Sequence, residues 1–405
     1  MTRRHFLLLT ILLAGLLLRL AAMAVQPFDL SDADAHSYAL MAATAFEAGG
    51  MRDIWGNHAF YSPGYPIALA PLVALFGAKA GVVLGANLGF AAAAILLAEL
   101  LGYRLGGKSV GLIAAAITAL LAPAALATAL VARENLSVPL LLGFAIACVA
   151  LLETRRPRLW SIGAGIAYGA GMLAGASVIL TGAALPLALW WRGERRAMLP
   201  ALALFAGATG AVLLPWLWHT QDVLGRPVLT TNAPFNLYVG NNPNATGRFV
   251  SMRDSPLGAE WKRMHARLGE LAATDELGRL ARAHIAAHPV QTAALSATKL
   301  LLFWLPDPPG AGDRHGALVT LLRWGEIAQH LLLLALAGVT LARWRGLGRG
   351  ARLVAAIIAL FWAVHAAAYV MPRYRLPAMP LVGALAALGL VPLLERRVRR
   401  REALA

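Results

Sequence analysis

Residues 6–25 read FLLLTILLAGLLLRLAAMAV, and residues 29–38, shortly after them, read DLSDADAHSY. An apolar run of about 20 residues is long enough to cross a bilayer as an α-helix. The second stretch begins where this helix would leave the membrane, and it carries Asp29, Asp32, Asp34 and His36. Because only 14% of the residues in the chain are charged, such a cluster of carboxylates at one membrane surface predicts a functional site there.

The start of the chain fits two interpretations. Arg3 and Arg4 precede the apolar run, and the small residues Ala21, Ala22 and Ala24 stand near its end, as in a secretory signal peptide. The alternative is an uncleaved first helix. We expect the uncleaved helix, because it keeps the aspartates anchored at the membrane surface.

Composition predicts an all-α polytopic membrane protein. The chain of 405 residues is 59% hydrophobic with a mean hydropathy of +0.65, whereas about a quarter of the residues of a soluble domain are charged. Apolar runs of spanning length recur along nearly the whole chain. We expect about ten transmembrane helices, at residues 6–25, 80–102, 110–130, 136–153, 159–175, 177–191, 197–218, 318–342, 353–371 and 376–394.

The net charge of +16 has a topological explanation. A soluble protein this basic would suggest a nucleic-acid partner, but here the Lys and Arg residues lie in short loops between apolar runs, as the positive-inside rule describes. We therefore expect membrane lipids and no nucleic acid as partners. The single cysteine, Cys148, excludes an intrachain disulfide and a Cys-rich metal site.

Loop charge also predicts the orientation of the helices. Two shorter apolar segments, 64–77 and 293–305, are expected to dip into the membrane or lie on it. If the first crossed alone, the basic loops around Arg156 and Arg195 would face outwards, against the positive-inside bias. Both termini are then cytoplasmic, and residues 26–63, 132–135, 219–292 and 371–375 share the outer face.

These assignments divide the chain into three parts. Residues 1–218 form a transmembrane module that includes the first outer loop, 26–63, and residues 293–405 form the last transmembrane helices and a basic cytoplasmic tail. Between them, residues 219–292 begin with a stretch rich in Asn, Pro and Gly, which is typical of a constrained loop. Apolar residues at helical spacing over 259–287 predict amphipathic helices, so this part is expected to form a small outer-face cap.

Several short motifs in the outer segments resemble those of the GT-C membrane glycosyltransferases. They are most similar to the branch related to the dolichyl-phosphate-mannose protein mannosyltransferases of family 39 and its bacterial relatives. Some bacterial members also have a segment similar to residues 236–247. The motifs are Asp34-x-x-x-Tyr38-x-x-x-Ala42, Phe60-Tyr-Ser-Pro-Gly-Tyr-Pro66, Glu134 at the start of a helix, and Arg373-Tyr-Arg-Leu-Pro377.

The resemblance implies a GT-C bundle with short juxtamembrane helices, and inverting transfer of a sugar from a polyprenyl-phosphate donor to a glycan, lipid or protein acceptor. The sequence also departs from the family pattern. Ala35 follows Asp34 where many members have a second acid, and Tyr61-Ser62 stands where some have a basic residue. Both departures leave open which residue binds the leaving phosphate.

This reaction needs a carboxylate base and a cation for the phosphate. Asp34 is our candidate base: if residues 34–47 are helical, its offset places Tyr38 on the same face. Asp32 is a second catalytic candidate, because a neighbouring carboxylate would alter the proton affinity of the base. The alternative for either aspartate is that it caps the helix.

Arg373 and Arg375 are the first candidates for binding the phosphate, with Tyr374 between them. Their alternative role is anchoring at lipid headgroups. Arg133 is a second choice, which Glu134 would orient unless it caps a helix. Two further groups have weaker support: His58 and Tyr61 as contacts to sugar or acceptor, and Asn241 as a partner for sugar hydroxyls or a turn residue.

No cofactor is expected. The Asp32-Ala-Asp34 pattern resembles the divalent-metal motif of nucleotide-sugar transferases, but the implied donor is a monophosphate and no Gly-rich phosphate loop is present. We therefore do not favour a metal. Two other functions remain open, namely a transporter or lipid flippase that binds substrate at the outer carboxylates, and a polymer ligase that uses lipid diphosphates.

Overall fold

The computed structural model describes residues 2–26, 28–47, 49–306 and 317–402. Within these ranges the chain is almost entirely helical, and its β contact is an isolated parallel bridge between Arg248 and Val370. Residues 307–316 and 403–405 of the expected C-terminal part lie outside the described ranges. The α-helices are α1 (Arg3–Val25), α2 (Ala33–Ala43), α3 (Gly64–Phe76), α4 (Ala80–Ala119), α5 (Ala122–Thr128), α6 (Glu134–Leu151), α7 (Pro157–Ala174), α8 (Ala184–Arg192), α9 (Arg195–Leu224), α10 (Asn232–Gly240), α11 (Glu260–Ala287), α12 (Pro289–Trp304), α13 (Ala317–Ala342), α14 (Arg349–Val364) and α15 (Met379–Glu402), with short 3₁₀ helices η1 (Ala176–Ala183), η2 (Met252–Asp254), η3 (Trp344–Gly346) and η4 (Pro372–Ala378).

Long apolar helices confirm the expected polytopic membrane architecture. Among the described residues, six helices are long and apolar enough to cross a membrane: α1, α4, α6, most of α9, most of α13, and η4 together with the start of α15. The α4 helix bends back on itself, so these six correspond to seven of the ten expected spans. The remaining three, which are α7, η1 with α8, and α14, do not meet the same test of length and composition.

The second and third expected spans form a hairpin within α4. The backbone leaves the helical conformation at Gly106 and at Gly107, where φ is +81°, a value that glycine adopts without a steric penalty. The helix then ends at Ala119, short of the expected limit at residue 130. Pro123 explains this difference, because proline lacks the backbone N–H of a helix interior and crowds the preceding turn, so it is best accommodated in the first turn of a new helix, here α5.

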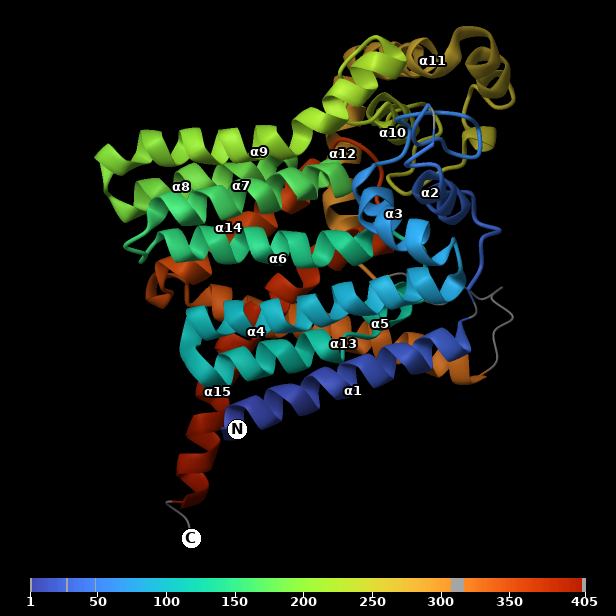
Figure 1. Ribbon diagram of the computed structural model, residues 1–405. Coiled ribbons are helices and arrows are strands. Elements are labelled where there is room, and N and C mark those ends of the chain that lie inside the picture. The colour runs from blue at the N-terminus through green and yellow to red at the C-terminus, as the bar shows by residue number, and fades with distance from the viewer. Residues whose placement is uncertain (1, 27, 48, 307–316, 403–405) are drawn as a thin grey trace.

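The long helices run side by side between two dissimilar ends (Figure 1). At one end, called the basic end, lie the bend of α4 and the turns between α6 and α7, α8 and α9, and α13 and α14, all of which carry Arg or Lys residues. At the other, called the site end, lie α2, α3, α5 and α10. The long outer segments are thus gathered opposite the basic turns.

The α6 helix lies at the centre of the bundle, since 78% of its most apolar 18-residue stretch is buried. In α9 only 6% of the corresponding stretch is buried. Poor burial of an apolar helix is expected where the helix faces lipid.

At the site end, α3 approaches α7 closely. A Cβ atom at Gly64 would lie 2.5 Å from the backbone nitrogen of Ala174, so this contact requires glycine.

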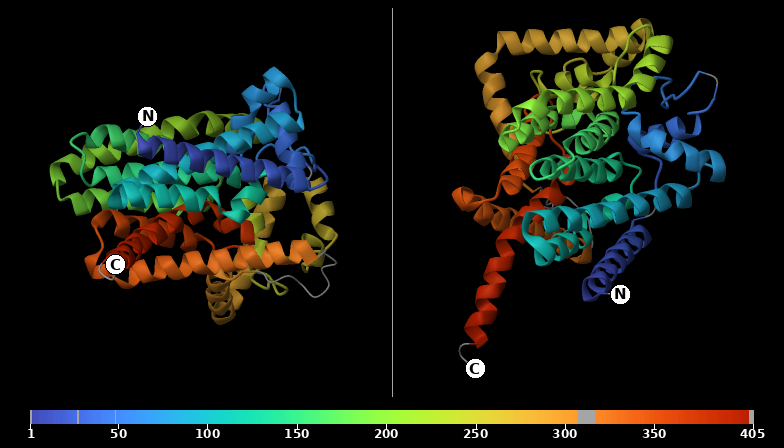
Figure 2. Two further views of the ribbon diagram at one scale, coloured as in Figure 1. Left: turned by 90° about the horizontal axis from the view of Figure 1, so that it is seen from below. Right: turned by 60° about the vertical axis from the view of Figure 1, so that its left-hand side comes forward.

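A cap formed by α10 and α11 covers part of the site end, and α11 lies across it before α12 returns towards the bundle (Figure 2). The cap has its own apolar cluster, which includes Tyr238, Met264 and Leu277. Glu270 attaches the cap to the first outer loop. Its carboxylate accepts hydrogen bonds from the backbone nitrogens of His58 and Ala59 and from the Thr231 hydroxyl, at 2.7–2.9 Å.

Candidate active site

The segment that follows α1 and the segment that precedes α15 meet at the carboxylate of Asp34. Asp34 lies in the first turn of α2, and Arg373 lies in η4, immediately before α15. Arg373 Nη2 is 2.6 Å from Asp34 Oδ2. About a third of each side chain is exposed, 34% for Asp34 and 31% for Arg373, so a substrate can reach this ion pair.

The other oxygen of Asp34 is held by Tyr61. The Tyr61 hydroxyl donates to Asp34 Oδ1 at 3.0 Å, and burial together with the negative charge of Asp34 raises the pKa of Tyr61. The phenol therefore remains a proton donor to the carboxylate. The ring of Tyr38, one helical turn after Asp34, packs edge-on against the ring of Tyr61 and supports it from within the protein.

A second carboxylate lies behind this pair. Glu134 is the first residue of α6, and its side chain is nearly buried. One of its oxygens, Oε1, is 3.7 Å from Arg133 Nε and 4.0 Å from Arg373 Nε. Arg133 in turn donates to the Ser62 hydroxyl at 2.9 Å. Two guanidinium groups thus lie within ion-pair distance of one nearly buried acid, and one of them, that of Arg373, also pairs with Asp34.

Asp32 has the geometry of a helix cap. It is the N-cap residue of α2, and its Oδ1 accepts a hydrogen bond from the backbone nitrogen of Asp34 at 3.0 Å. This bond satisfies one of the free donors in the first helical turn. The geometry of Asp32 therefore fits the capping alternative. The side chain of Asp32 contacts the backbone of Asp34 and not its carboxylate.

Arg375 points away from the ion pair. It is 8% exposed and donates to the carbonyl oxygens of Phe303 and Leu305 at the end of α12, a site where a cation is favoured because the last carbonyls of a helix are unsatisfied. Tyr374, between the two arginines, packs against Tyr369 and His365. Within the part of the chain that the structure describes, the two arginines expected to act together are therefore separated, and it is Arg373 that pairs with Asp34.

Two other candidates occupy structural positions near the site. Asn241 is 3% exposed, its amide nitrogen donates to the carbonyls of Leu237 and Ala367, and its oxygen accepts from Lys299 Nζ at 3.0 Å. These bonds fit the turn alternative. The ring of His58 faces that of His219, with centroids 6.5 Å apart, while its backbone is held by Glu270.

Sequence reasoning did not identify Ser62, Glu270 or Lys299 as part of this region. Ser62 lies inside the motif that carried the resemblance, so its position could have been proposed. Glu270 and Lys299 lie on helices without any motif, and their partners are distant in sequence. Among the described residues, no group of three or more His, Cys, Asp or Glu side chains is arranged to hold a metal ion.

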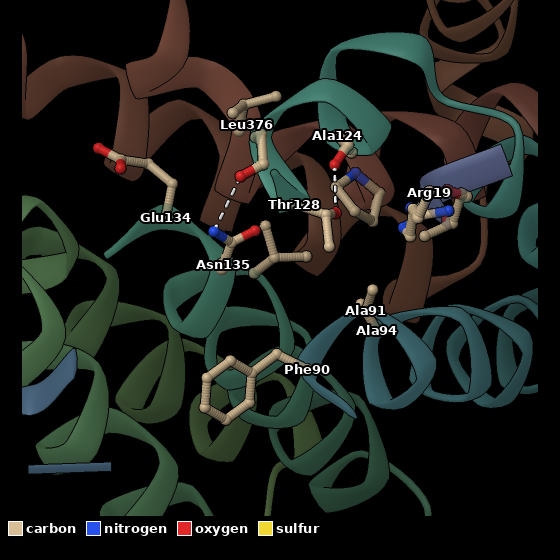
Figure 3. A pocket seen from close by; sticks show the side chains of 13 residues that line it. Arg19, Phe90, Ala91, Ala94, Ala124, Thr128, Glu134, Asn135 and Leu376 are labelled. Carbon is tan, nitrogen blue, oxygen red and sulfur yellow. Dashed lines mark hydrogen bonds between the residues drawn. The ribbon is translucent and has the colours of Figure 1, made fainter. Parts of the chain in front are cut away.

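A small cavity lies beside Glu134, between α1, α4, α5, α6 and the start of α15 (Figure 3). Glu134 and Asn135 stand on one side of it and Arg19 on the other, with Phe90 and several alanines between them. The Arg19 guanidinium donates to the carbonyls of Gly15, Thr118 and Ala119, so it caps the end of α4. The remaining lining is largely apolar.

Comparison with solved structures identifies the fold. The oligosaccharyltransferase of Archaeoglobus fulgidus in its apo form matches with a TM-score of 0.57 and 13% identity, over 99% of this chain and 52% of that one. The archaeal oligosaccharyltransferase AglB from the same organism, in complex with an inhibitory peptide and a dolichol-phosphate, matches with a TM-score of 0.55 and 14% identity, over 98% and 51%. ArnT from Cupriavidus metallidurans bound to undecaprenyl phosphate shows a weaker likeness, with a TM-score of 0.49 and 14% identity, over 93% of this chain and 77% of that one.

These likenesses, at identities below 25%, show that the chain has the GT-C fold of membrane glycosyltransferases, as its motifs implied. The chain spans about half the length of the oligosaccharyltransferases that it matches. No family model matches the sequence, and a search of curated proteins finds no match. The fold is therefore shown, while the narrower relation to the family-39 branch remains a hypothesis.

Proposed function

We propose that this protein is a membrane glycosyltransferase that moves a hexosyl or pentosyl unit from a polyprenyl-phosphate carrier to a glycan, lipid or protein acceptor. The observation that carries the proposal is the carboxylate of Asp34, accessible at the site end and held between Arg373 and Tyr61. A solvent-accessible base beside fixed cations is what glycosyl transfer from a lipid phosphate requires. The relation to the family-39 branch is part of this proposal.

In the proposed reaction, Asp34 accepts the proton of an acceptor hydroxyl as the hydroxyl oxygen bonds to the anomeric carbon of the donor. The bond from that carbon to the phosphate oxygen breaks at the same time, and its electron pair leaves with the polyprenyl phosphate. A single displacement of this kind inverts the anomeric centre. No metal or other cofactor enters the proposed mechanism.

The leaving phosphate needs positive charge, which Arg373 and Arg133 supply. Guanidinium groups bind phosphate oxygens through paired N–H donors, and both arginines lie at ion-pair distance from Glu134. We expect donor binding to draw Arg373 from Asp34 towards the phosphate, which frees Asp34 Oδ2 to accept a proton. Tyr374 and His58 are further candidates for contact with the substrates.

We propose that the first isoprenoid units of the carrier lie along the largely apolar helix surface beside Glu134. The cavity there has a volume of about 30 Å³, room for little more than a water molecule, so the lipid chain lies on this surface and not inside the cavity. The archaeal oligosaccharyltransferase solved with a dolichol-phosphate has the same fold, which supports a carrier of this chemistry.

The orientation that we propose follows from the distribution of charge. The basic turns lie at one end of the bundle and the candidate site at the other, so the positive-inside rule assigns the site to the outer face. We propose a bacterial inner membrane, with cytoplasmic termini and catalysis on the periplasmic side. The three-part division of the chain, with residues 219–292 as the cap, belongs to the same proposal.

Two of the charged groups inside the helices, Glu99 and Arg19, argue against the transporter alternative. Transporters use such groups to bind substrate near the middle of the membrane. Here Glu99 in α4 pairs with Arg4, and Arg19 binds the carbonyls at the end of α4. Both groups hold α1 against α4, so they are committed to helix packing.

The test is a donor screen with purified protein in nanodiscs. Synthetic undecaprenyl-phosphate sugars, undecaprenyl-diphosphate sugars and nucleotide sugars are offered separately, with envelope glycolipids from a deletion strain as acceptors, and products are identified by mass spectrometry. We expect sugar release and transfer from at least one monophosphate donor. Turnover confined to diphosphate donors would favour the ligase alternative, and movement of an intact lipid between leaflets without turnover would favour the flippase.

A further inference from the structure

Residues 53–57 form a turn that is held by hydrogen bonds to the side chain of Asp53. The buried Asp53 accepts hydrogen bonds at Oδ1 from the backbone nitrogens of Trp55 and Asn57, both at 2.8 Å, and at Oδ2 from the side-chain amide of Asn57. Gly56 has a φ of +81°, which completes the turn. The oxygen of Asn57 also lies 2.8 Å from His265 Nε2 on the cap. The turn is therefore tied both to itself and to α11.

This turn presents the side chain of Trp55 next to Tyr61, the residue that binds the candidate base. Trp55 is 55% exposed, although it is the largest side chain in a turn whose polar groups are buried. Its ring is stacked on that of Tyr61, with centroids 6.4 Å apart and an angle of 11° between the planes. Since the Tyr61 hydroxyl binds Asp34, one tyrosine ring separates the indole from the candidate base.

We propose that Trp55 is a sugar-binding residue, whose indole stacks on the C–H face of a sugar ring positioned for reaction at Asp34. The proposal rests on the glycosyltransferase function proposed above. A pyranose or furanose ring has one face of C–H groups, and an electron-rich aromatic plane attracts such weakly positive hydrogens. The ring belongs either to the donor or to the acceptor, and the experiment below distinguishes these sources.

Anchoring at the membrane surface does not explain this arrangement. An interfacial tryptophan requires an exposed ring at headgroup level, and Trp218 on α9, which is 80% exposed, meets that need. Trp55 has two additional features: a turn held by a buried carboxylate, and a ring aligned with the tyrosine that binds Asp34. These features orient the ring, and orientation matters for a ligand with a defined face.

The test compares W55A, W55F and the matched control W218A in nanodiscs, using the undecaprenyl-phosphate sugar that is active in the donor screen. Transfer to the acceptor and slow hydrolysis of the donor by water are measured separately. We expect W55A to raise one KM about tenfold, with W55F closer to wild type and W218A unchanged. A higher KM for the donor in both reactions assigns the stacked ring to the donor, and a higher KM for the acceptor alone assigns it to the acceptor.

A W55A protein with both KM values within twofold of wild type overturns the inference and leaves the glycosyltransferase proposal standing. A change in W218A as large as that in W55A also overturns it, because the effect would then come from membrane anchoring. The folding of each variant is checked by its thermal unfolding midpoint. Failure of the proposed function has a different signature, namely a wild-type protein that releases no sugar from any monophosphate donor.

Discussion

Arg373 Nη2 and Asp34 Oδ2 are 2.6 Å apart although 339 positions separate the two residues in the sequence. Neither residue lies on a long helix of the bundle: Asp34 follows α1 through a loop, and Arg373 precedes α15. The packing of the first and last parts of the chain therefore assembles the site. Both members of the pair are accessible, whereas the carboxylate of the Arg4–Glu99 pair between α1 and α4 is nearly buried.

Replacement of Arg373 should reduce catalysis far more than binding. Arg373 contacts Asp34 through Nη2 and approaches Glu134 through Nε, and a lysine cannot serve both positions with one ammonium group. We expect R373A to lower kcat about 100-fold or more, the usual effect of removing one group that stabilises a leaving anion, and R373K to be intermediate. The measurement is steady-state sugar transfer by purified protein.

Arg375 provides the comparison. Its guanidinium binds the carbonyls at the end of α12, so R375M should lower the thermal unfolding midpoint while the folded fraction keeps nearly normal kcat. Equal losses of kcat in R373A and R375M would contradict the separation of the two arginines seen in the structure.

Glu270 should control the order of the first outer loop. It accepts hydrogen bonds from the His58 and Ala59 backbone nitrogens and from Thr231, and bonds to a charged acceptor contribute about 1.5–3 kcal/mol each. In E270Q, loss of about 2 kcal/mol would make these two amides exchange about 30-fold faster. Hydrogen exchange with mass spectrometry measures this. E276Q on the same helix, where Glu276 pairs with Arg279 at the surface, is the control and should leave the exchange unchanged.

Lys299 and Asn241 should behave as a coupled pair. Lys299 is fully buried, and its ammonium group donates to Asn241 Oδ1 at 3.0 Å. N241A leaves a buried charge without this acceptor, at a cost of about 2 kcal/mol, whereas K299M removes the charge itself and should be tolerated. Thermal unfolding of the two single variants and the double variant gives the coupling energy. If the losses in N241A and K299M simply add, the pair makes no specific contribution.

Part of this site was predictable from local sequence. The offset between Asp34 and Tyr38 fits one face of a helix, and loop charge assigned both Asp34 and Arg373 to the same side of the membrane. The end of α4 was also within reach, since Pro123 marks it. These features depend on neighbouring residues, on helix periodicity or on the charge of whole loops.

The remaining features depend on packing between distant segments. Arg373 and Arg375 looked equivalent in sequence, but η4 is a 3₁₀ helix, in which successive side chains are rotated by roughly 120°. Residues two apart therefore point in different directions, and only tertiary structure decides which one meets Asp34. Glu270 binds backbone groups more than 200 positions away, a contact that no local pattern marks.

The central claim is that Asp34 is the base for sugar transfer, and its most direct test is the single-turnover rate of D34N. The asparagine side chain has the same size as aspartate, and its amide oxygen and nitrogen can still form hydrogen bonds with Arg373 and Tyr61. It cannot accept the proton of the acceptor hydroxyl. We expect a rate at least about 1,000-fold below wild type, within the range attributed to a general base, with normal donor binding and an unchanged unfolding midpoint. D29N in the same loop, where Asp29 binds Ser31 at the surface, should be fully active. A D34N rate within about tenfold of wild type would contradict the account.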